Sequence, residues 1–266
     1  LKNRNVKIIK ESIVNNITKK DKFIIDTNNG IIEADKVIVA TGSYAASKTG
    51  SDGIGYIWAK KFNHNIIKPL PALVGLKCKG NFFNEWKGIR TDALITYENN
   101  KELGEIQLTD YGVSGVCIFN LSSKIIRNLK DNPIITINFI PFLDISNTNE
   151  LISYFNKRNE LVKNRSISEL MDGFLNYKLV NLILKISNIA KEDKWNNIKK
   201  ESKLKLMNNL INFELEVIGS NDFDKSQTCS GGIPLDEIDV NTMESLKQKG
   251  LYFIGELLDA DGKCGG

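Results

Sequence analysis

The sequence predicts a mixed α/β fold, in which one domain is interrupted by a β-rich domain that itself carries a helical insert. Three patterns lead to this prediction. An apolar run without alternation at residues 37–40 indicates a strand buried on both faces. Residues 72–143 alternate with period two in several places, which is typical of half-buried strands. Residues 147–212 carry apolar side chains at helical spacing.

The N-terminal part is predicted to hold short strands followed by a helix. Asn28-Asn29-Gly30 predicts a hairpin turn, because Asn-Gly supplies the positive φ angles that a tight turn needs. The buried strand at 36–40 ends in Thr41-Gly42, and open α/β sheets bind ligands beside such turns. A helix is expected at 52–62, with Ser51 or Asp52 as its N-cap. The remaining strands are expected at 6–9, 12–17, 22–27 and 31–34.

The rest of the chain is predicted to pass from strands to helices and back. Pro69 and Pro71 mark a domain boundary. A hairpin is expected with its turn at Asn99-Asn100. The expected strands are 93–98, 104–108, 133–139, 213–218 and 251–254, and the expected helices are 150–163, 167–172, 177–190 and 201–212.

Composition and charge narrow the class of protein. The chain has 266 residues, of which 41% are hydrophobic and 26% charged, with a net charge of +4. No apolar run approaches the ~20 residues of a membrane span, and no apolar leader is recognised. Lysines are scattered and not gathered into one basic run, so charge does not argue for nucleic acid. We therefore expect a cytoplasmic protein that acts on a small molecule and not at a membrane.

The cysteines predict neither disulfides nor a metal site. Cys78, Cys117, Cys229 and Cys264 form no CxxC pair, and His64 is the single histidine. Reduced thiols of a cytoplasmic protein are the expectation.

Three motifs point to one family. Supporting stretches lie at 49–56, 71–74 and 104–115. The block that begins at Thr242 is the most specific, because no generic packing requirement dictates it. The motifs are Ala40-Thr41-Gly42-Ser43, then Thr228-Cys229-Ser230-Gly231-Gly232-Ile233-Pro234-Leu235, and Thr242-Met243-Glu244-Ser245 running into Gly250-Leu251-Tyr252-Phe253-Ile254-Gly255-Glu256-Leu257-Leu258-Asp259-Ala260-Asp261-Gly262.

The order and spacing of these motifs resemble the bacterial three-domain NAD(P)/FAD-dependent oxidoreductases, the aminoacetone-oxidase-like flavoproteins, over essentially the whole chain. That resemblance implies an enzyme that transfers electrons or hydride between a small-molecule substrate and FAD, with NAD(P)H as a candidate donor. It implies an incomplete FAD-binding Rossmann-like domain with a glutathione-reductase-like fold. The implied domains are 1–70 and 229–266 for FAD binding, 71–146 for a β-barrel-like domain, 147–212 for the helical insert and 213–228 for a return strand of the β domain.

The family's GxGxxG fingerprint is expected upstream of Leu1. This glycine loop lets backbone N–H groups approach the pyrophosphate of the cofactor. We therefore expect the 266-residue chain alone, as a truncated fragment, to bind FAD weakly or not at all and to be inactive. A longer protein with the fingerprint should purify yellow.

The resemblance also implies which residues face the cofactor. Thr41 and Gly42 lie on the phosphate–ribose path, Glu256 or Asp259 accepts hydrogen bonds from the ribitol, and Gly231 and Gly232 lie on the substrate side. No residue stands out as an acid or base, so no catalytic side chain is assigned. The full cofactor set is Val14, Ala40, Thr41, Gly42, Gly231, Gly232, Gly255, Glu256, Asp259, Gly262, Gly265 and Gly266.

Each assignment has a structural alternative. The alternatives are a plain strand-end turn at Thr41-Gly42, a solvated acidic loop at residues 259–262, and a flexible end at the last glycines. Cys229 and Cys264 are expected to be small residues in tight places and not reactive thiols. His64 is expected to cap the first helix through the helix dipole and not to act as a base.

Two other functions stay open. The β and helical domains could form an interaction module without flavin, or the flavoprotein could act on nucleic acid. The cofactor prediction depends on one geometric expectation, that the turns at Thr41-Gly42 and Gly255-Glu256 are neighbouring ends of a single sheet.

Overall fold

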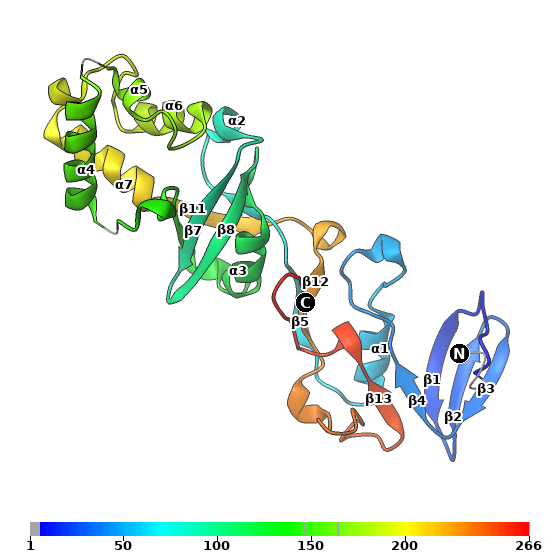
Figure 1. Ribbon diagram of the computed structural model, residues 1–266. Coiled ribbons are helices and arrows are strands. Elements are labelled where there is room, and N and C mark those ends of the chain that lie inside the picture. The colour runs from blue at the N-terminus through cyan, green and yellow to red at the C-terminus, as the bar shows by residue number, and fades with distance from the viewer. Residues whose placement is uncertain (1–5, 146, 164, 266) are drawn as a thin grey trace. The chain divides into compact units, whose positions relative to one another are not determined.

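The computed structural model describes residues 6–145, 147–163 and 165–265. Contacts divide the chain into two units, which are described separately (Figure 1). Unit 1 comprises Leu1–Pro69 and Thr228–Asp261, and unit 2 comprises Leu70–Gln227 and Gly262–Gly266.

Unit 1 is built from short strands around one main helix. Its core contains Phe23, Val39, Trp58, Leu251 and Phe253, all buried. Its strands are β1 (Val14–Lys19), β2 (Phe23–Thr27), β3 (Gly30–Ala34), β4 (Val37–Val39), β12 (Thr228–Gly232) and β13 (Leu251–Phe253). Its helices are α1 (Ile54–Lys61) and the short 3-10 turns η2 (Ser47–Thr49), η7 (Leu235–Glu237) and η8 (Gly255–Leu257).

Strands β1, β2 and β3 form an antiparallel sheet in chain order. Thr27 pairs with Gly30, which confirms the predicted hairpin, but the positive φ falls on Gly30 alone, at 117°. The strand predicted at 6–9 is wrong, since these residues have no regular structure. Ile8 in this stretch is 60% exposed, and strand propensity without a neighbouring strand to pair with does not make a strand.

Strands β4 and β13 form a two-stranded parallel sheet. Val39 is buried on one face, whereas Ile38 is 63% exposed on the other. The expectation that β4 is buried on both faces is therefore wrong for this chain. The core of unit 1 covers one side of this small sheet only, because alternate side chains of a strand point to opposite faces.

Helix α1 is bounded by two residues in the left-handed region. Gly53, with φ 74°, is the N-cap, so the predicted cap Asp52 lies one residue earlier, where its carboxylate accepts the amide of the first helical residue at 3.0 Å. Asn63 has φ 64°, and the His64 amide donates to the Ala59 carbonyl at 3.0 Å. This closing pattern is a Schellman motif, which satisfies carbonyls at the helix end.

The chain passes from unit 1 to unit 2 along β5 (Ile67–Ala72). Pro69 and Pro71 lie within this strand and do not interrupt it, and the unit boundary falls directly after Pro69. β5 belongs to a two-stranded sheet with β12. A strand with one partner tolerates prolines, because one edge needs no N–H donors.

Unit 2 contains a closed six-stranded barrel in the order β10-β11-β6-β9-β8-β7, which confirms the predicted β-barrel-like domain (Figure 1). Alternate side chains of β7, such as Ala93 and Ile95, are fully buried in its core. Tyr97 pairs with Asn100, so the hairpin turn begins at Glu98, one residue before its predicted position. The barrel strands are β6 (Leu76–Cys78), β7 (Arg90–Tyr97), β8 (Asn100–Leu108), β9 (Gly112–Ser114), β10 (Ile134–Asn138) and β11 (Phe213–Ser220).

A helix that was not predicted from the sequence packs against the barrel strands. Helix α3 (Val116–Arg127) buries Cys117, Leu121 and Ile125 against the barrel core. Gly115, at φ 109°, precedes it. Its buried side chains recur at helical spacing, a pattern that the assignment of this segment to strands overlooked.

The helical insert agrees with the predicted helices. Asn147 caps the first helix by accepting the Glu150 amide at 2.9 Å, and Ser166 with Glu169 forms a capping box. The helices of unit 2 outside α3 are α2 (Phe83–Trp86), α4 (Thr148–Leu161), α5 (Ile167–Leu170), α6 (Tyr177–Ile186), α7 (Lys200–Ile211), η3 (Leu129–Asp131), η4 (Pro141–Leu143), η5 (Trp195–Asn197) and η6 (Phe223–Lys225).

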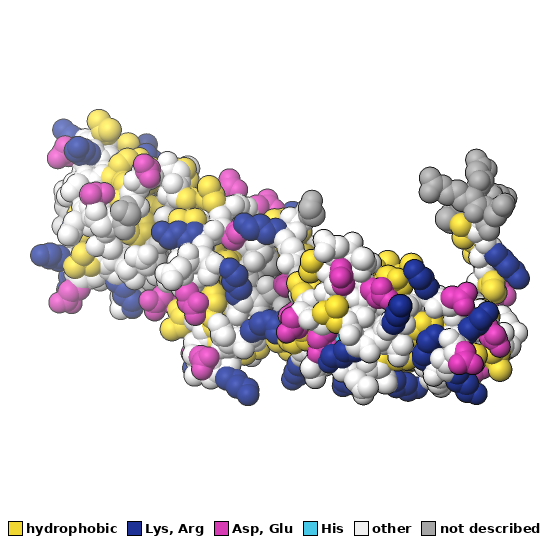
Figure 2. All heavy atoms as spheres, turned by 90° about the horizontal axis from the view of Figure 1, so that it is seen from below, with side chains coloured by type: hydrophobic (Ala, Val, Ile, Leu, Met, Phe, Trp, Pro, Cys, Tyr) yellow, Lys and Arg dark blue, Asp and Glu magenta, His cyan; other side chains and the backbone are white. Residues whose placement is uncertain are grey.

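The surface carries charges of both signs. On the face seen in Figure 2, Lys and Arg side chains are interspersed with Asp, Glu and hydrophobic ones. Across the described residues, no helix combines the length and apolarity that a bilayer span requires.

Gly112→Ala tests the packing of the barrel. Gly112 has φ +145°, and an added Cβ would fall well inside contact with the Leu76 carbonyl oxygen. We expect a loss of roughly 3 kcal/mol or more in the free energy of unfolding, because backbone strain and a steric clash combine. The matched control is Gly88→Ala, at φ +86° with nothing within 4 Å, where only the strain of ~1 kcal/mol applies. Urea unfolding followed by circular dichroism measures both, and equal losses would contradict the packing argument.

Candidate functional site

The turns that follow β4 and β13 lie side by side in unit 1. Val37 pairs with Leu251 and Val39 with Phe253, in parallel, and the Ile254 amide continues the ladder by donating to the Val39 carbonyl at 3.2 Å. Because both strands run in the same direction, their carboxyl ends reach the same edge of the sheet. The two glycine turns are therefore neighbours, as the sequence analysis expected.

Side-chain hydrogen bonds join these two turns directly. The Ser43 hydroxyl donates to the Glu256 carboxylate at 2.7 Å, and the Tyr56 hydroxyl donates to the Glu256 main-chain carbonyl at 3.0 Å. Ser43 is 1% exposed and also accepts the Ala45 amide at 3.1 Å. Helix α1 supplies Tyr56, so three segments hold the predicted acidic residue at the strand ends.

The β12 segment packs against the same turn. The Ile233 amide donates to the Leu257 carbonyl at 2.8 Å, and the Asp259 amide donates to the Ile233 carbonyl at 2.9 Å. A Cβ on Gly232 would lie 2.5 Å from the Leu257 carbonyl oxygen, and one on Gly231 would lie 2.6 Å from the Lys68 carbonyl oxygen. Both glycines also have positive φ, so a larger residue would force these backbones apart.

The hydroxyl of Thr41 indicates whether this edge of the β4–β13 sheet suits a polar ligand. It is buried and has no hydrogen-bond partner among the described residues. A buried hydroxyl without a partner costs free energy, so it marks a place where a bound group could accept or donate. Gly55 on α1 is needed here, because a Cβ would collide with the Thr41 hydroxyl and the Leu257 side chain. The hydroxyls and carboxylate at this edge have the donors and acceptors that sugar hydroxyls and phosphates use.

Burial keeps a phenol and a thiol near this edge protonated. Burial raises the pKa of Tyr56 well above its ordinary value, and the nearby Cys229, Tyr44 and Glu256 raise it further. Burial also raises the pKa of the Cys229 thiol, although the Ser43 hydroxyl and two backbone amides oppose the shift. Cys229 is 3% exposed. It is thus a small buried thiol and not an activated nucleophile, as its place in the motif suggested.

The remaining predicted residues are Val14, Ala40, Gly262, Gly265 and Gly266. Val14 begins β1, and Ala40 is exposed directly after β4. Gly262 and Gly265 belong to unit 2, where Lys263 pairs with Glu102 at 2.6 Å. Gly266 lies outside the described residues. In the described part of the chain, no group of three His, Cys, Asp or Glu side chains could hold a metal ion.

Two residues of the site were missed from the sequence. Ser43 lies within the motif Ala40-Thr41-Gly42-Ser43, yet only its first three residues were assigned to the cofactor. A buried serine directly after a strand-end glycine is a signal that could have found it. Tyr56 on α1 ends the supporting stretch 49–56, but its role could not be inferred from the sequence, because its partner is a main-chain carbonyl 200 residues away.

A second polar cluster of unit 1 surrounds the single histidine. The Nδ1 atom of His64 lies 2.8 Å from the Glu237 carboxylate, and its Nε2 atom lies 2.7 Å from the Ser245 hydroxyl. Glu237 also accepts from the Asn65 amide at 3.0 Å and from the Lys247 ammonium at 2.6 Å. The prediction that His64 caps the helix is correct only for its backbone, since its side chain is fully buried inside this network.

This network explains the motif that begins at Thr242. The Ser245 hydroxyl accepts the Gln248 amide at 2.9 Å, the Glu244 carboxylate accepts the Gly250 amide at 2.6 Å, and Met243 has φ 63°. Specific hydrogen bonds and backbone geometry, and not a generic packing requirement, thus account for the motif. The motif fixes the loop that leads into β13.

The comparisons with known proteins agree with this architecture. The family model described as "HI0933-like protein Rossmann domain" matches residues 1–266. The chain belongs to this family of Rossmann-domain proteins.

Its relatives are reductases and RNA-modifying enzymes by name. The 3-dehydro-bile acid delta(4,6)-reductase of Clostridium scindens is 32% identical over 251 residues, which is 92% of this chain and 61% of that protein. The ribosomal RNA dihydrouridine synthase of Escherichia coli is 25% identical, over 92% of this chain and 59% of that protein. The enzyme of the same name from Haemophilus influenzae is 26% identical, over 93% of this chain and 60% of that protein. The chain therefore spans about three fifths of the length of these relatives.

The histidine network makes stability depend on pH. Burial lowers the pKa of His64 below its ordinary 6.5, so on acidification the unfolded chain binds a proton that the folded chain does not. The free energy of unfolding should be fully present above pH ~6.5 and should fall as the pH drops toward the lowered pKa.

Urea unfolding at closely spaced pH values between roughly 5 and 8 measures this dependence. Because His64 is the only histidine, His64→Gln should remove the slope in this range. A wild-type slope that is no steeper than that of the variant would contradict the assignment.

Proposed function

We propose that the natural protein that carries this chain is a FAD-dependent reductase that adds hydrogen across a carbon–carbon double bond conjugated to a carbonyl group. One observation carries the proposal: relatives named for very different substrates share this bond change. The bile-acid relative is named for reducing Δ4,6 double bonds of a 3-dehydro, that is 3-oxo, compound. Dihydrouridine, in the names of the RNA relatives, is uridine with the double bond beside its C4 carbonyl saturated.

FAD is the cofactor that this chemistry and the Rossmann-domain family favour. When bound, it would supply hydride transfer between a nicotinamide donor and the substrate. Thr41 and Glu256 are the residues that we expect to hold its sugar and phosphate groups, with the Thr41 hydroxyl donating and the Glu256 carboxylate accepting, while Ser43 positions that carboxylate. In balance, the substrate gains one hydride and one proton, and the nicotinamide donor is oxidised by two electrons.

The chain's own residues would position the cofactor. Gly231 and Gly232 let β12 lie against neighbouring backbone, where any side chain would block the approach. Tyr56 anchors the turn at Glu256 through its main-chain carbonyl and stays protonated. The resemblance to aminoacetone-oxidase-like flavoproteins supports the same cofactor, whereas the names of the relatives favour reduction over amine oxidation.

The loop that binds the pyrophosphate of FAD is proposed to lie outside these 266 residues. The chain spans about three fifths of its relatives, and the GxGxxG loop is expected ahead of it. The exposed Ile38 on β4 supports this proposal, because parallel sheets are normally covered on both faces. We propose that a preceding βαβ unit covers this face and supplies the glycine loop.

Ser43→Ala and Glu256→Ala test the cofactor site in the natural protein. Glu256→Ala removes a partner for the cofactor, and Ser43→Ala removes the 2.7 Å hydrogen bond that positions this partner, so each should weaken FAD binding about fivefold, as the loss of ~1 kcal/mol implies. Quenching of FAD fluorescence measures the affinity. The control is Glu33→Ala on β3, an exposed carboxylate that should leave the affinity unchanged. Affinities equal to wild type in both site variants would remove these residues from the site.

The reaction class is tested with matched substrates. The reduced protein should be reoxidised under anaerobic conditions by a small cyclic enone, and an alkene of the same skeleton without the carbonyl should not react. The reason is that the carbonyl stabilises the charge that develops when hydride adds to the conjugated carbon. Stopped-flow recording of the flavin absorbance provides the measurement. Equal rates with both compounds, or no reaction with either one while the flavin is bound, would contradict the proposal.

A further inference from the structure

The helical insert concentrates the positive charge of the chain. Residues 147–212 contain 12 Lys and Arg and 7 Asp and Glu, a net charge of +5, whereas the whole chain carries +4. The rest of the chain therefore carries a net charge of −1, because +4 minus +5 is −1. The sequence contains no continuous basic run, and the excess becomes evident only when the charges of the folded insert are summed.

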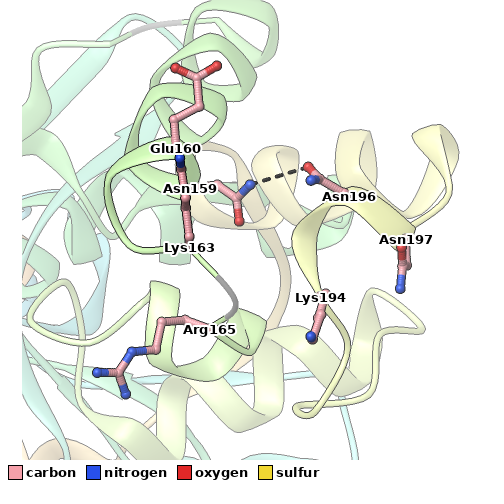
Figure 3. Close-up of a pocket in the computed structure, with 7 residues that line it drawn as sticks. All are labelled: Asn159, Glu160, Lys163, Arg165, Lys194, Asn196 and Asn197. Atoms are coloured by element: carbon pink, nitrogen blue, oxygen red, sulfur yellow. Dashed lines mark hydrogen bonds between the residues drawn. The ribbon is translucent and has the colours of Figure 1, made fainter.

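Part of this charge gathers around one pocket in the insert. The pocket has a volume of about 360 Å³ and lies between the end of α4 and the turn η5. Lys163, Arg165 and Lys194 are its cations, and three asparagine side chains add amide donors (Figure 3). The asparagines are Asn159, Asn196 and Asn197.

The cations of this pocket are only weakly neutralised. Lys163 and Lys194 have no ion-pair partner in the parts of the chain that the structure describes, and Arg165 pairs with the exposed Glu169 at 2.8 Å. The one acid of the lining, Glu160, points away from Arg165 and Lys194 (Figure 3). The pocket therefore presents net positive charge to solvent.

The backbone that carries these side chains is held in place. The Trp195 indole donates to the Asn156 side chain at 2.7 Å, and its ring packs 5.5 Å from that of Phe155 on α4. The Ile167 amide donates to the Asp193 carbonyl at 2.7 Å. Asn159 donates to Asn196 across the pocket at 3.3 Å. A rigid base lowers the entropy cost of binding a ligand across both segments.

We propose that the helical insert binds the phosphate backbone of a nucleic acid through this pocket. Lys and Arg with neighbouring amide donors are the groups that contact phosphodiesters. A charge excess of +5 spread over the insert exceeds what a single small anion would neutralise, and it suits a ligand whose negative charge repeats along a chain. The inference goes beyond the proposed reductase, and its test needs neither flavin nor turnover, so each proposal can fail without the other.

The test is fluorescence anisotropy with a labelled 20-nucleotide single-stranded RNA and a DNA of the same sequence, at several salt concentrations. Lys163→Gln, Arg165→Gln and Lys194→Gln are combined in one variant. Loss of three phosphate contacts should weaken binding about tenfold or more near 0.1 M salt and reduce the slope of log affinity against log salt by about 2.

The control variant combines Lys10→Gln, Lys20→Gln and Lys130→Gln, exposed residues outside the insert with the same total charge change, and it should bind as wild type. Thermal melts followed by circular dichroism ensure that both variants are folded. Equal losses in both variants would overturn the proposal, since net charge alone would then explain binding. The proposal would also be overturned if the wild-type protein bound neither RNA nor DNA. The same holds if it bound phosphatidylserine vesicles, measured in parallel, and neither nucleic acid. A preference between RNA and DNA would identify the source of the phosphates.

Discussion

The parallel pairing of β4 with β13 is the constraint on which the candidate site depends. It joins segments more than 200 residues apart and brings both of their glycine turns to one edge. The Ser43–Glu256 and Tyr56–Glu256 hydrogen bonds then fix the distance between these turns. A three-residue pairing would be weak alone, so these contacts and the core around Phe253 have to stabilise it.

The two polar clusters of unit 1 have different roles. The first cluster is formed by Thr41, Ser43, Tyr56 and Glu256. It is partly exposed, and its buried Thr41 hydroxyl has no hydrogen-bond partner among the described residues, so the cluster can bind a ligand. The cluster around His64 is fully partnered: Glu237 accepts from several donors, and both ring nitrogens of His64 are engaged. It resembles a Ser–His–acid arrangement in its distances, but Ser245 is 5% exposed and its oxygen already accepts backbone amides. It stabilises the loop ahead of β13 and offers no accessible nucleophile.

Much of the architecture could be predicted from local patterns. Helical spacing found the helices of the insert, and alternation with turn residues found the β7–β8 hairpin. Helix α3 was missed because its segment was assigned to strands, although its buried residues recur at helical spacing. The exposure of Ile38 was missed because an apolar run does not say whether both faces are covered.

The site was only partly predictable. Strand-end glycines and an acidic motif indicated Thr41, Gly42 and Glu256, because these residue types have characteristic conformations and hydrogen-bonding groups. Ser43 and Tyr56 became evident only from the geometry, as their partners lie about 200 residues away. The sequence motif at Thr242 was recognised, whereas its physical reason, a buried network around His64, required the folded structure.

The central claim is that the paired turns after β4 and β13 face a dinucleotide. Hydrogen–deuterium exchange of the natural protein, with and without FAD, tests it most directly. The account predicts that FAD slows exchange of backbone amides in both residues 41–45 and residues 255–259, because both segments line one ligand. Slower exchange in only one of these segments, or in neither while FAD is bound, would contradict it.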